Sequence, residues 1–293
     1  SPSGGHYAGA PLAPGRLRVI TAEFDLAPPS AAPTGHDLQA AAERLTGAPL
    51  PELEVHWLTG YGNPTRNADR YGEHNVFLAG DAAHVHFPQN GLGIGTGLHD
   101  AVNLGWKLAA VLAGRAGDEL LDTYHAERYP VGAEACTVVR AQIELCHPPE
   151  RVEALRSVVA RLFEFDDVNR HLVETVTGTG VRYPMPYATQ HPLLGRRLRT
   201  VPLETAGGAT DVAKLLHGGR GVLLDLSDGE SGWARESAGW ESLIDLVTAR
   251  PVPGIDATAL LLRPDGHVAW VATAEDDKGL RAALSTWWGR AAR

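Results

Sequence analysis

The stretch with the clearest capacity for chemistry pairs a carboxylate with a run of glycines. Asp81 follows Gly80 at the end of an apolar segment, and four glycines come next at alternate positions: Gly91, Gly93, Gly95 and Gly97. A carboxylate accepts hydrogen bonds from sugar or sugar-alcohol hydroxyls, and glycines let the backbone approach a ligand closely. A helix predicted from about Leu98 would present free N–H groups and a partial positive charge to an anion. These residues predict a site for a hydroxylated or anionic ligand, although a plain turn and a flexible glycine loop explain the composition equally well.

The neighbouring residues predict the elements that position this site. Val76–Ala79 is continuously apolar, which is typical of an interior strand covered on both faces. Ligands of open α/β sheets lie outside the carboxyl ends of strands, and Asp81 follows such an end. The helix that follows has its apolar residues mostly on one face: Leu98, Ala101, Val102, Leu108, Val111 and Leu112.

Further elements are predicted on both sides of this stretch. We expect strands over Arg16–Phe24 and Val55–Tyr61, and helices over 36–45, 120–128, 132–145, 150–165 and 167–176. Pro130 is expected to separate the second and third of these helices. A proline-containing linker over 178–192 then leads to the last part of the chain.

The last hundred or so residues predict a small α/β module. A strand over 222–226, a helix over 239–249, a hairpin of 259–263 with 267–272 and a helix over 279–290 follow one another. Pro264-Asp265-Gly266 supplies the tight turn of the hairpin. A module of this size is long enough to fold independently. It contains no cysteine, which excludes dithiol redox chemistry there, so we expect a role in packing or in stabilising a homodimer.

Composition excludes several classes of protein. The chain has 293 residues, which favours about two domains, and its net charge of -9 argues against a nucleic-acid binder. No apolar run reaches the roughly 18 residues of a membrane span. The start of the chain lacks the basic and apolar regions of a signal peptide. Cys136 and Cys146 have neither metal-binding nor redox-motif spacing, so we expect free thiols and a cytoplasmic location.

Several longer motifs carry a resemblance to a known family. GDAAHVHFP (Gly80–Pro88), followed by GLHDAVNLGWKLAAVL (Gly97–Leu112), closely resembles the second flavin-binding motif of the class A flavoprotein aromatic hydroxylases, the p-hydroxybenzoate hydroxylase-like group. The nearest subfamily is the one that tailors aromatic polyketides such as angucyclines and anthracyclines. HPLLGRRL (His191–Leu198), GRGVLLDL (Gly219–Leu226) and LLRPDGHVAW (Leu261–Trp270) resemble its thioredoxin-like C-terminal domain.

The resemblance covers the chain from about Arg16 and implies an α/β fold. A remnant of a p-hydroxybenzoate hydroxylase-like FAD and substrate domain would precede a C-terminal thioredoxin-like α/β domain. The implied boundaries are 1–72 for part of the substrate-binding domain, 73–190 for the C-terminal part of the FAD-binding domain with the helices that follow, and 191–293 for the thioredoxin-like domain.

The resemblance also implies roles for individual residues. Asp81 would hold the ribityl chain of FAD, with Gly80 allowing the approach, and Pro88 would lie near the reactive face of the flavin ring. The backbone of Gly93, Ile94 and Gly95 would face the pyrimidine end of the ring. The implied reaction uses NAD(P)H and O₂ to hydroxylate an aromatic polyketide in antibiotic biosynthesis, and no protein nucleophile is required.

Several other residues have two interpretations. Trp57, Tyr61 and Arg66 would line an aromatic substrate pocket, while core packing for Trp57 and a surface pair for Arg66 remain equally open. His84 and His86 would share one face of a strand, but without further ligands nearby we expect structural hydrogen bonds and no metal site.

The sequence departs from the family in two places. No G-x-G-x-x-G motif follows a strand, so the N-terminal half of the FAD domain is expected on the same chain or on another one, and this chain alone is not expected to hold FAD tightly. NGLGIG (Asn90–Gly95) replaces the family's GGQGLN, which puts Leu92 and Gly95 where the family has amide side chains. The alternative function is therefore a relative that does not oxygenate and binds an aromatic polyketide for a non-redox step or assists a partner enzyme.

Overall fold

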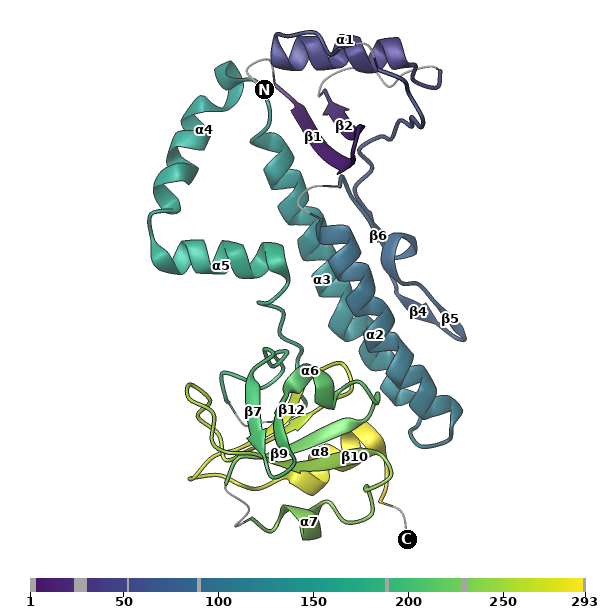
Figure 1. The fold of residues 1–293 in the computed structure, drawn as a ribbon. Helices are drawn as coiled ribbons and strands as arrows, with labels where there is room; N and C mark the ends of the chain where they lie inside the picture. Colours follow the sequence, from purple (N-terminus) through teal and green to yellow (C-terminus); the bar gives the residue numbers. More distant parts are fainter. Residues whose placement is uncertain are drawn as a thin grey trace. The chain divides into compact units, whose positions relative to one another are not determined.

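A computed structural model describes residues 4–23, 31–51, 53–88, 91–187, 190–227 and 231–291. The chain divides into two compact units, each built from several segments (Figure 1). Unit 1 comprises Ser1–Arg66, Val85–Gly91 and Glu134–Val173, and unit 2 comprises Asn67–His84, Leu92–Ala133 and Glu174–Arg293. Among the described residues, no helix has the length and apolar character needed to cross a membrane.

Unit 1 begins with a hairpin and a helix. Strands β1 (His6–Ala13) and β2 (Arg16–Ala22) pair antiparallel, with His6 opposite Ala22. The predicted strand at 16–24 is confirmed as far as Ala22, while Phe24 lies outside the described residues. Helix α1 (Gly35–Thr46) confirms the helix predicted at 36–45, and Thr34 begins it with a capping box in which Thr34 and Asp37 bond each other's backbone N–H groups.

The rest of unit 1 is helical or irregular. Helices α4 (Pro149–Leu162) and α5 (Asp166–Thr177) confirm two predicted helices. The strand predicted at 55–61 is wrong, because these residues form no regular element and Val55, Trp57 and Tyr61 are exposed. The alternation of apolar and polar residues at 55–61 does not mark a half-buried sheet face, because no strand of the described residues pairs with this segment. Two-residue strands β3 (Arg66–Asn67) and β6 (His84–Val85) pair with each other.

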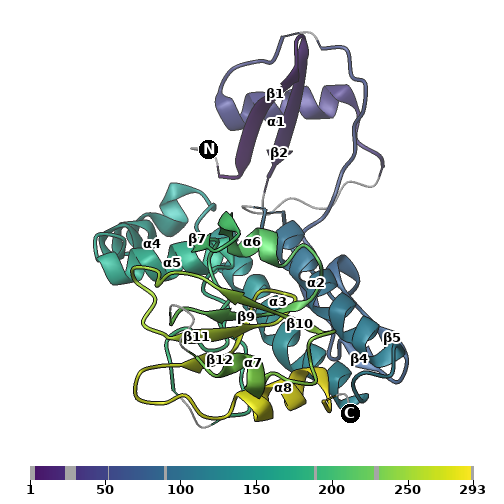
Figure 2. The ribbon, with the colours of Figure 1, turned by 60° about the horizontal axis from the view of Figure 1, so that its bottom comes forward.

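Helices α2 (Leu92–Leu112) and α3 (Glu119–Glu144) lie side by side (Figures 1 and 2). The predicted break at Pro130 is wrong, because α3 continues through it. Proline in a helix removes one N–H donor, and packing on both sides of it can hold the helix together. Buried residues of α3 stand on either side of Pro130: Tyr124, Glu127, Arg128, Ala135 and Val139.

Helix α2 is inverted in polarity. It begins at Leu92, earlier than the predicted Leu98, so Gly93, Gly95 and Gly97 belong to the helix and not to a loop. Apart from Leu92, its buried residues are polar or charged: Thr96, Asp100, Asn103 and Lys107. Its exposed residues are apolar or small: Ile94, Gly95, Leu98, Ala101, Val102, Gly105, Ala109 and Leu112. The apolar face exists as predicted, but most of it faces solvent: Leu98, Ala101, Val102 and Leu112 are exposed, while Leu108 and Val111 are half-buried. Charged partners on α3 take the other face.

The segment that precedes α2 is a short hairpin followed by a turn. Strand β4 (Gly72–Glu73) pairs with β5 (Val76–Phe77), and a 3₁₀ turn, η1 (Gly80–Ala82), follows. The interior strand predicted at 76–79 is therefore wrong. An interior strand needs a partner on each side, and within the described residues only β4 pairs with β5, which leaves Val76 66% exposed.

A four-stranded sheet organises the C-terminal part of unit 2. Its order is β10 (Ile244–Thr248), β9 (Gly221–Asp225), β11 (Ala259–Leu262) and β12 (Val268–Ala272). Strands β9 and β10 are parallel, and the other two pairs are antiparallel. Helix α8 (Leu280–Trp288) packs on one face, where Figure 2 also shows α7 (Trp233–Glu236). The predicted hairpin and last helix are confirmed, and both Trp287 and Trp288 are buried.

Two further features complete this part. The opposite face of the sheet is covered by apolar residues that include Leu194, Leu198, Leu203 and Val212, from the region of β7 (Pro202–Thr205), β8 (Gly208–Asp211) and α6 (Val212–Leu215). The helix predicted at 239–249 is wrong, because Ile244–Thr248 forms β10. β-branched residues and pairing with β9 favour a strand over the helical period of this short segment. The α/β fold class is confirmed.

Candidate functional site

The turn η1 lies directly against the first half of α2. Gly80 has a φ of +58°, a conformation that favours glycine. A Cβ atom at Gly97 would lie 3.2 Å from the Cα of Gly80, closer than ordinary contacts. The two glycines therefore allow the turn and the helix to approach within backbone contact, which fixes where Asp81 stands relative to α2.

Asp81 and part of the first turn of α2 are exposed. The side chain of Asp81 is exposed at the turn. The amide groups of Leu92, Gly93, Ile94 and Gly95 form the first turn of α2, where N–H groups have no carbonyl partner within the helix and carry a partial positive charge. Ile94 is 79% exposed, and a Cβ atom at Gly95 would meet nothing within 4 Å.

This set of donors and acceptors suits the cofactor that the resemblance implies. A carboxylate bonds the hydroxyls of a sugar-alcohol chain, and the positive end of a helix stabilises negative charge on a ring system. The empty space beside Gly95 leaves the backbone approachable. The residues present therefore fit a flavin, and contact of Gly80, Asp81, Gly93, Ile94 and Gly95 with the cofactor stays a prediction.

A buried carboxylate that the sequence reasoning missed holds the turn in place. Asp100 is fully buried in α2, and its Oδ2 accepts hydrogen bonds from the Gly80 N–H at 3.0 Å and from Nε2 of His84 at 2.8 Å. Its Oδ1 accepts from Nε of Arg128 at 2.6 Å. Burial would raise the pKa of Asp100, but the His84 hydrogen bond and the Arg128 charge hold it below its ordinary value.

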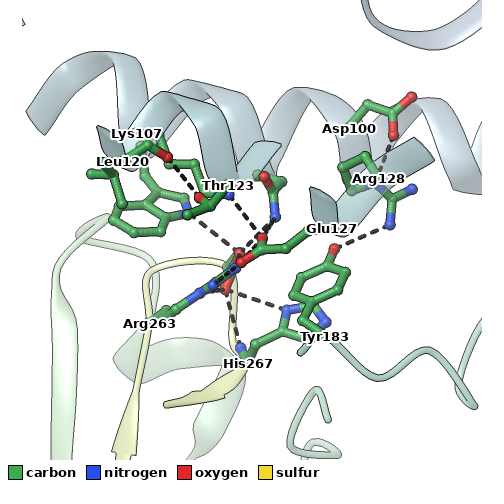
Figure 3. A network of polar contacts seen from close by, with 12 residues as sticks. Asp100, Lys107, Leu120, Thr123, Glu127, Arg128, Tyr183, Arg263 and His267 are labelled. Carbon is green, nitrogen blue, oxygen red and sulfur yellow. Dashed lines mark hydrogen bonds and ion pairs between the residues drawn. The ribbon is translucent and has the colours of Figure 1, made fainter. Parts of the chain in front are cut away.

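A second buried network lies two turns further along α2 (Figure 3). Oε2 of Glu127 accepts from Lys107 Nζ at 2.8 Å, from Asn103 Nδ2 at 2.7 Å and from Arg263 Nη2 at 2.9 Å. Arg263 also pairs with Asp265 in the turn between β11 and β12. Burial lowers the pKa of Lys107 to about 8, although the charge of Glu127 opposes that shift. All of these charges are paired, so we assign the network to structure.

The remaining predicted site residues belong to unit 1. Pro88 is exposed, Trp57 is 78% exposed and Tyr61 is 52% exposed, with its ring 6.1 Å from that of Phe87. Core packing of Trp57 is therefore wrong. The side chain of Arg66 is exposed. Contact of these residues with flavin or substrate stays a prediction.

Two other predictions concern His84, His86 and the altered glycine segment. His84 bonds Asp100, and Nδ1 of His86 lies 2.9 Å from the carbonyl oxygen of Phe87, so both histidines have structural hydrogen bonds as expected. Leu92, at a position where the family has an amide, is buried as the first residue of α2, whereas Gly95 is open. Asn90 lies outside the described residues.

Comparison with known proteins identifies two family models in the chain. The FAD binding domain matches residues 8–139, and the C-terminal domain of the aromatic-ring hydroxylases matches residues 191–291. The two matches cover the turn, α2 and the four-stranded sheet. They confirm the resemblance that the motifs predicted.

Individual relatives are similar over almost the whole chain. A 12-dehydrotetracycline 5-monooxygenase/anhydrotetracycline 6-monooxygenase from Streptomyces rimosus is 43% identical over 97% of this chain and 57% of its own length. A dialkyldecalin synthase from Streptomyces rugosporus is 45% identical over 97% of this chain and 56% of its own length. A solved aromatic hydroxylase from angucycline biosynthesis aligns with a TM-score of 0.87 and 40% identity, over 98% of this chain and 60% of that structure. The chain thus spans somewhat more than half the length of these relatives.

Proposed function

The chain belongs to the FAD-binding aromatic-ring hydroxylases, and from this premise we propose that it forms part of an FAD-dependent monooxygenase. The proposed reaction hydroxylates an aromatic polyketide in antibiotic biosynthesis, with NAD(P)H as reductant and O₂ as the oxygen source. The relatives named for tetracycline and angucycline oxidation support this substrate class.

One structural observation carries the proposal. The close approach of Gly80 to Gly97 brings the exposed Asp81 carboxylate next to α2. The first turn of this helix is exposed at Ile94 and Gly95. An acceptor for hydroxyls beside a cluster of N–H donors matches the two chemical ends of a flavin that carries a ribityl chain.

The residues of this chain would bind and orient the cofactor. Asp81 would bond the ribityl hydroxyls, and the amides of Gly93, Ile94 and Gly95 would stabilise negative charge at the pyrimidine end of the ring. Pro88 would border the reactive face, and Trp57, Tyr61 and Arg66 would contact the substrate. Bound FAD would supply the redox chemistry, passing electrons from NAD(P)H to O₂.

The exposed apolar face of α2 supports a further part of the proposal. A contiguous apolar helix face in water marks an interaction surface. We assign this face to the remaining portion of the FAD-binding domain, because the relatives have more residues than this chain matches. The division into 1–72, 73–190 and 191–293, the thioredoxin-like nature of the last part and a cytoplasmic homodimer belong to the same proposal.

FAD binding by the purified protein tests the proposal. We expect weak binding of FAD, measured as a change in the flavin absorbance bands when FAD is titrated with the protein, and an Asp81→Ala variant that binds FAD at least about tenfold more weakly because a charged hydrogen-bond acceptor is lost. Asp118→Ala, which removes an exposed carboxylate from the loop after α2, is the matched control. Anhydrotetracycline with NADPH then serves as a probe substrate, with gain of one oxygen atom as the expected product. Equal FAD affinity of the parent and the Asp81 variant would contradict the site.

A second candidate function is favoured by the synthase among the relatives. Because a protein of 45% identity is named a dialkyldecalin synthase, a non-redox role on a polyketide fits this fold as well. The altered residues Leu92 and Gly95 also favour it. Under this alternative, a polyketide probe would be converted or bound without consumption of NAD(P)H, whereas stoichiometric NAD(P)H oxidation supports the monooxygenase.

A further inference from the structure

The backbone of η1 (Gly80–Ala82), called the flavin turn below, is held by the buried carboxylate of Asp100. Asp100 accepts the Gly80 N–H with the same oxygen that bonds His84, while its second oxygen bonds Arg128. The side chains of Asp100, His84 and Arg128 are all 0% exposed. Because Asp81 is the next residue after Gly80, any movement of this hydrogen bond also moves the carboxylate that is proposed to bind the ribityl chain.

Arg128 links this carboxylate to two other places. Its Nη2 donates to the carbonyl oxygen of Thr96 at 3.1 Å. Thr96 lies one helical turn after Leu92, the first residue of α2. Its Nη1 donates to the phenolic oxygen of Tyr183 at 3.0 Å (Figure 3). One buried guanidinium therefore ties together the turn, the start of α2 and the segment that leads to the C-terminal sheet.

Tyr183 in turn rests on the C-terminal sheet. Its ring stacks on the imidazole of His267, with ring centroids 3.9 Å apart and planes at 20°. The guanidinium of Arg263 lies 5.2 Å from the centroid of the same ring. The backbone N–H of Tyr183 donates to Gly195, whose own N–H donates to Val268 in β12. The ring and the backbone of Tyr183 thus both have partners in the C-terminal part of unit 2, which position its hydroxyl as the acceptor for Arg128.

We propose that the C-terminal sheet braces the flavin turn through Tyr183, Arg128 and Asp100, which act as positioning residues for Gly80 and Asp81. This gives the cysteine-free C-terminal module a role in the flavin site without any contact with the cofactor. The effect on FAD binding rests on the proposed function. The brace, meaning the contacts that run from the C-terminal sheet through Tyr183, Arg128 and Asp100 to Gly80, exists in the chain without FAD.

The most selective variant is Tyr183→Phe, which removes the hydroxyl that accepts from Arg128 and keeps the ring on His267. Tyr187→Phe is the matched control: it makes the same change four residues later and removes the acceptor for Trp287 Nε1 at 2.9 Å, a hydrogen bond that does not involve Arg128. Asp100→Asn is the stronger variant, because it removes the charge that holds Gly80. Loss of one hydrogen bond to a charged group corresponds to about a 10- to 100-fold change in an equilibrium constant.

Two measurements follow the brace. The first is hydrogen–deuterium exchange of the peptide that contains Gly80, measured in the protein without FAD. We expect this peptide to exchange about tenfold faster in Tyr183→Phe than in the parent, and faster still in Asp100→Asn. In Tyr187→Phe we expect the parent rate. The second is the FAD dissociation constant, which we expect to rise in the same order.

The outcomes separate the brace from the proposed function. If the parent protein shows no FAD binding even at high FAD concentration, the proposed function fails, and the exchange of the Gly80 peptide still tests the brace. If the parent binds FAD but Tyr183→Phe matches Tyr187→Phe in both exchange and affinity, the brace is overturned. Faster exchange over the whole chain in Tyr183→Phe would also overturn it, because that result shows a general loss of stability.

Discussion

The ammonium group of Lys107 lies 2.8 Å from the carboxylate of Glu127, and neither side chain is more than 2% exposed. Arg263 reaches the same carboxylate with two hydrogen bonds, of 2.6 and 2.9 Å. One carboxylate on α3 thus pairs with a cation from α2 and with another from the C-terminal sheet, and Asp265 supplies a second negative charge. Burial alone would raise the pKa of Glu127, but the charges of Arg263 and Lys107 hold it below its ordinary value.

We predict that Glu127→Gln destabilises the chain strongly. The variant leaves the two buried cations without this negative charge, and breaking a buried ion pair costs about 3–5 kcal/mol. Urea unfolding of parent and variant measures the difference. Glu204→Gln is the control. Glu204 pairs with Arg250, and their side chains are 71% and 76% exposed. Exposed ion pairs of this kind contribute about 0–1 kcal/mol to stability. Equal losses in the two variants would contradict the assignment.

We predict that His99 makes the protein less stable in mild acid. Burial, together with the charges of Arg197, Arg128 and His267, lowers the pKa of His99 from 6.5 to about 4, and Asp265 only partly opposes this. Between these two values the unfolded chain binds a proton that the folded chain does not, so stability falls as the pH falls from 6.5 towards 4.

The test of the His99 prediction compares unfolding midpoints at pH 7 and pH 5. His99→Gln is expected to lose less stability over this range than the parent, and His56→Gln, whose side chain is 60% exposed, is expected to behave like the parent. Some pH dependence will remain, because burial also lowers the pKa of His267. A His99→Gln variant with the same pH dependence as the parent rules the mechanism out.

We predict that alanine stabilises the chain at Gly105 of α2 and that this gain is lost at Gly97. Gly105→Ala places a Cβ in open space, so the helix gains up to about 1 kcal/mol from alanine's higher propensity. Gly97→Ala places its Cβ 3.2 Å from the Cα of Gly80, so packing strain offsets that gain. Thermal or urea unfolding is expected to rank Gly105→Ala above the parent and Gly97→Ala below Gly105→Ala. The reverse order would show that η1 does not press on α2.

We predict that both thiols react slowly in the folded chain. Cys136 is buried and Cys146 is half-buried, and burial raises the pKa of each above 9.0, against the opposing charges of Arg140 and Arg156. A thiol–disulfide reagent at pH 8 is expected to label the native chain at least about tenfold more slowly than the urea-unfolded chain. Labelling of either cysteine at the unfolded rate in native buffer would count against the burial described here.

The sequence predicts the candidate site because the motif carries local backbone requirements. Gly80 needs a positive φ and Gly97 needs a bare Cα, and both requirements are met by glycine and visible in the sequence. Helices α1, α4, α5 and α8 and the β11–β12 hairpin were also predictable, since their periodicity and turn residues act within one segment.

The errors all involve partners distant in the chain. The helical period predicted an apolar face on α2 but not the side that α3 covers, because Glu127 and Arg128 determine that choice. The sequence gives no sign of the role of Asp100 for the same reason, because Gly80, His84 and Arg128 are distant in the chain. The segment at 244–248 became a strand through pairing with β9, and the apolar run at 76–79 lacks the strand partners that its composition predicts.

The inverted polarity of α2 determines its rotational register. Hydrophobic burial is non-directional and would turn Ile94, Leu98 and Val102 towards α3. Hydrogen bonds are directional: Asp100 and Lys107, two helical turns apart, each have their own partner on α3. A shift of one residue rotates an α-helix by about 100° and would break both bonds at once. The rotation of the first turn of α2 about the helix axis is therefore specified by charge pairing, and substitutions on the apolar face are expected to leave it unchanged.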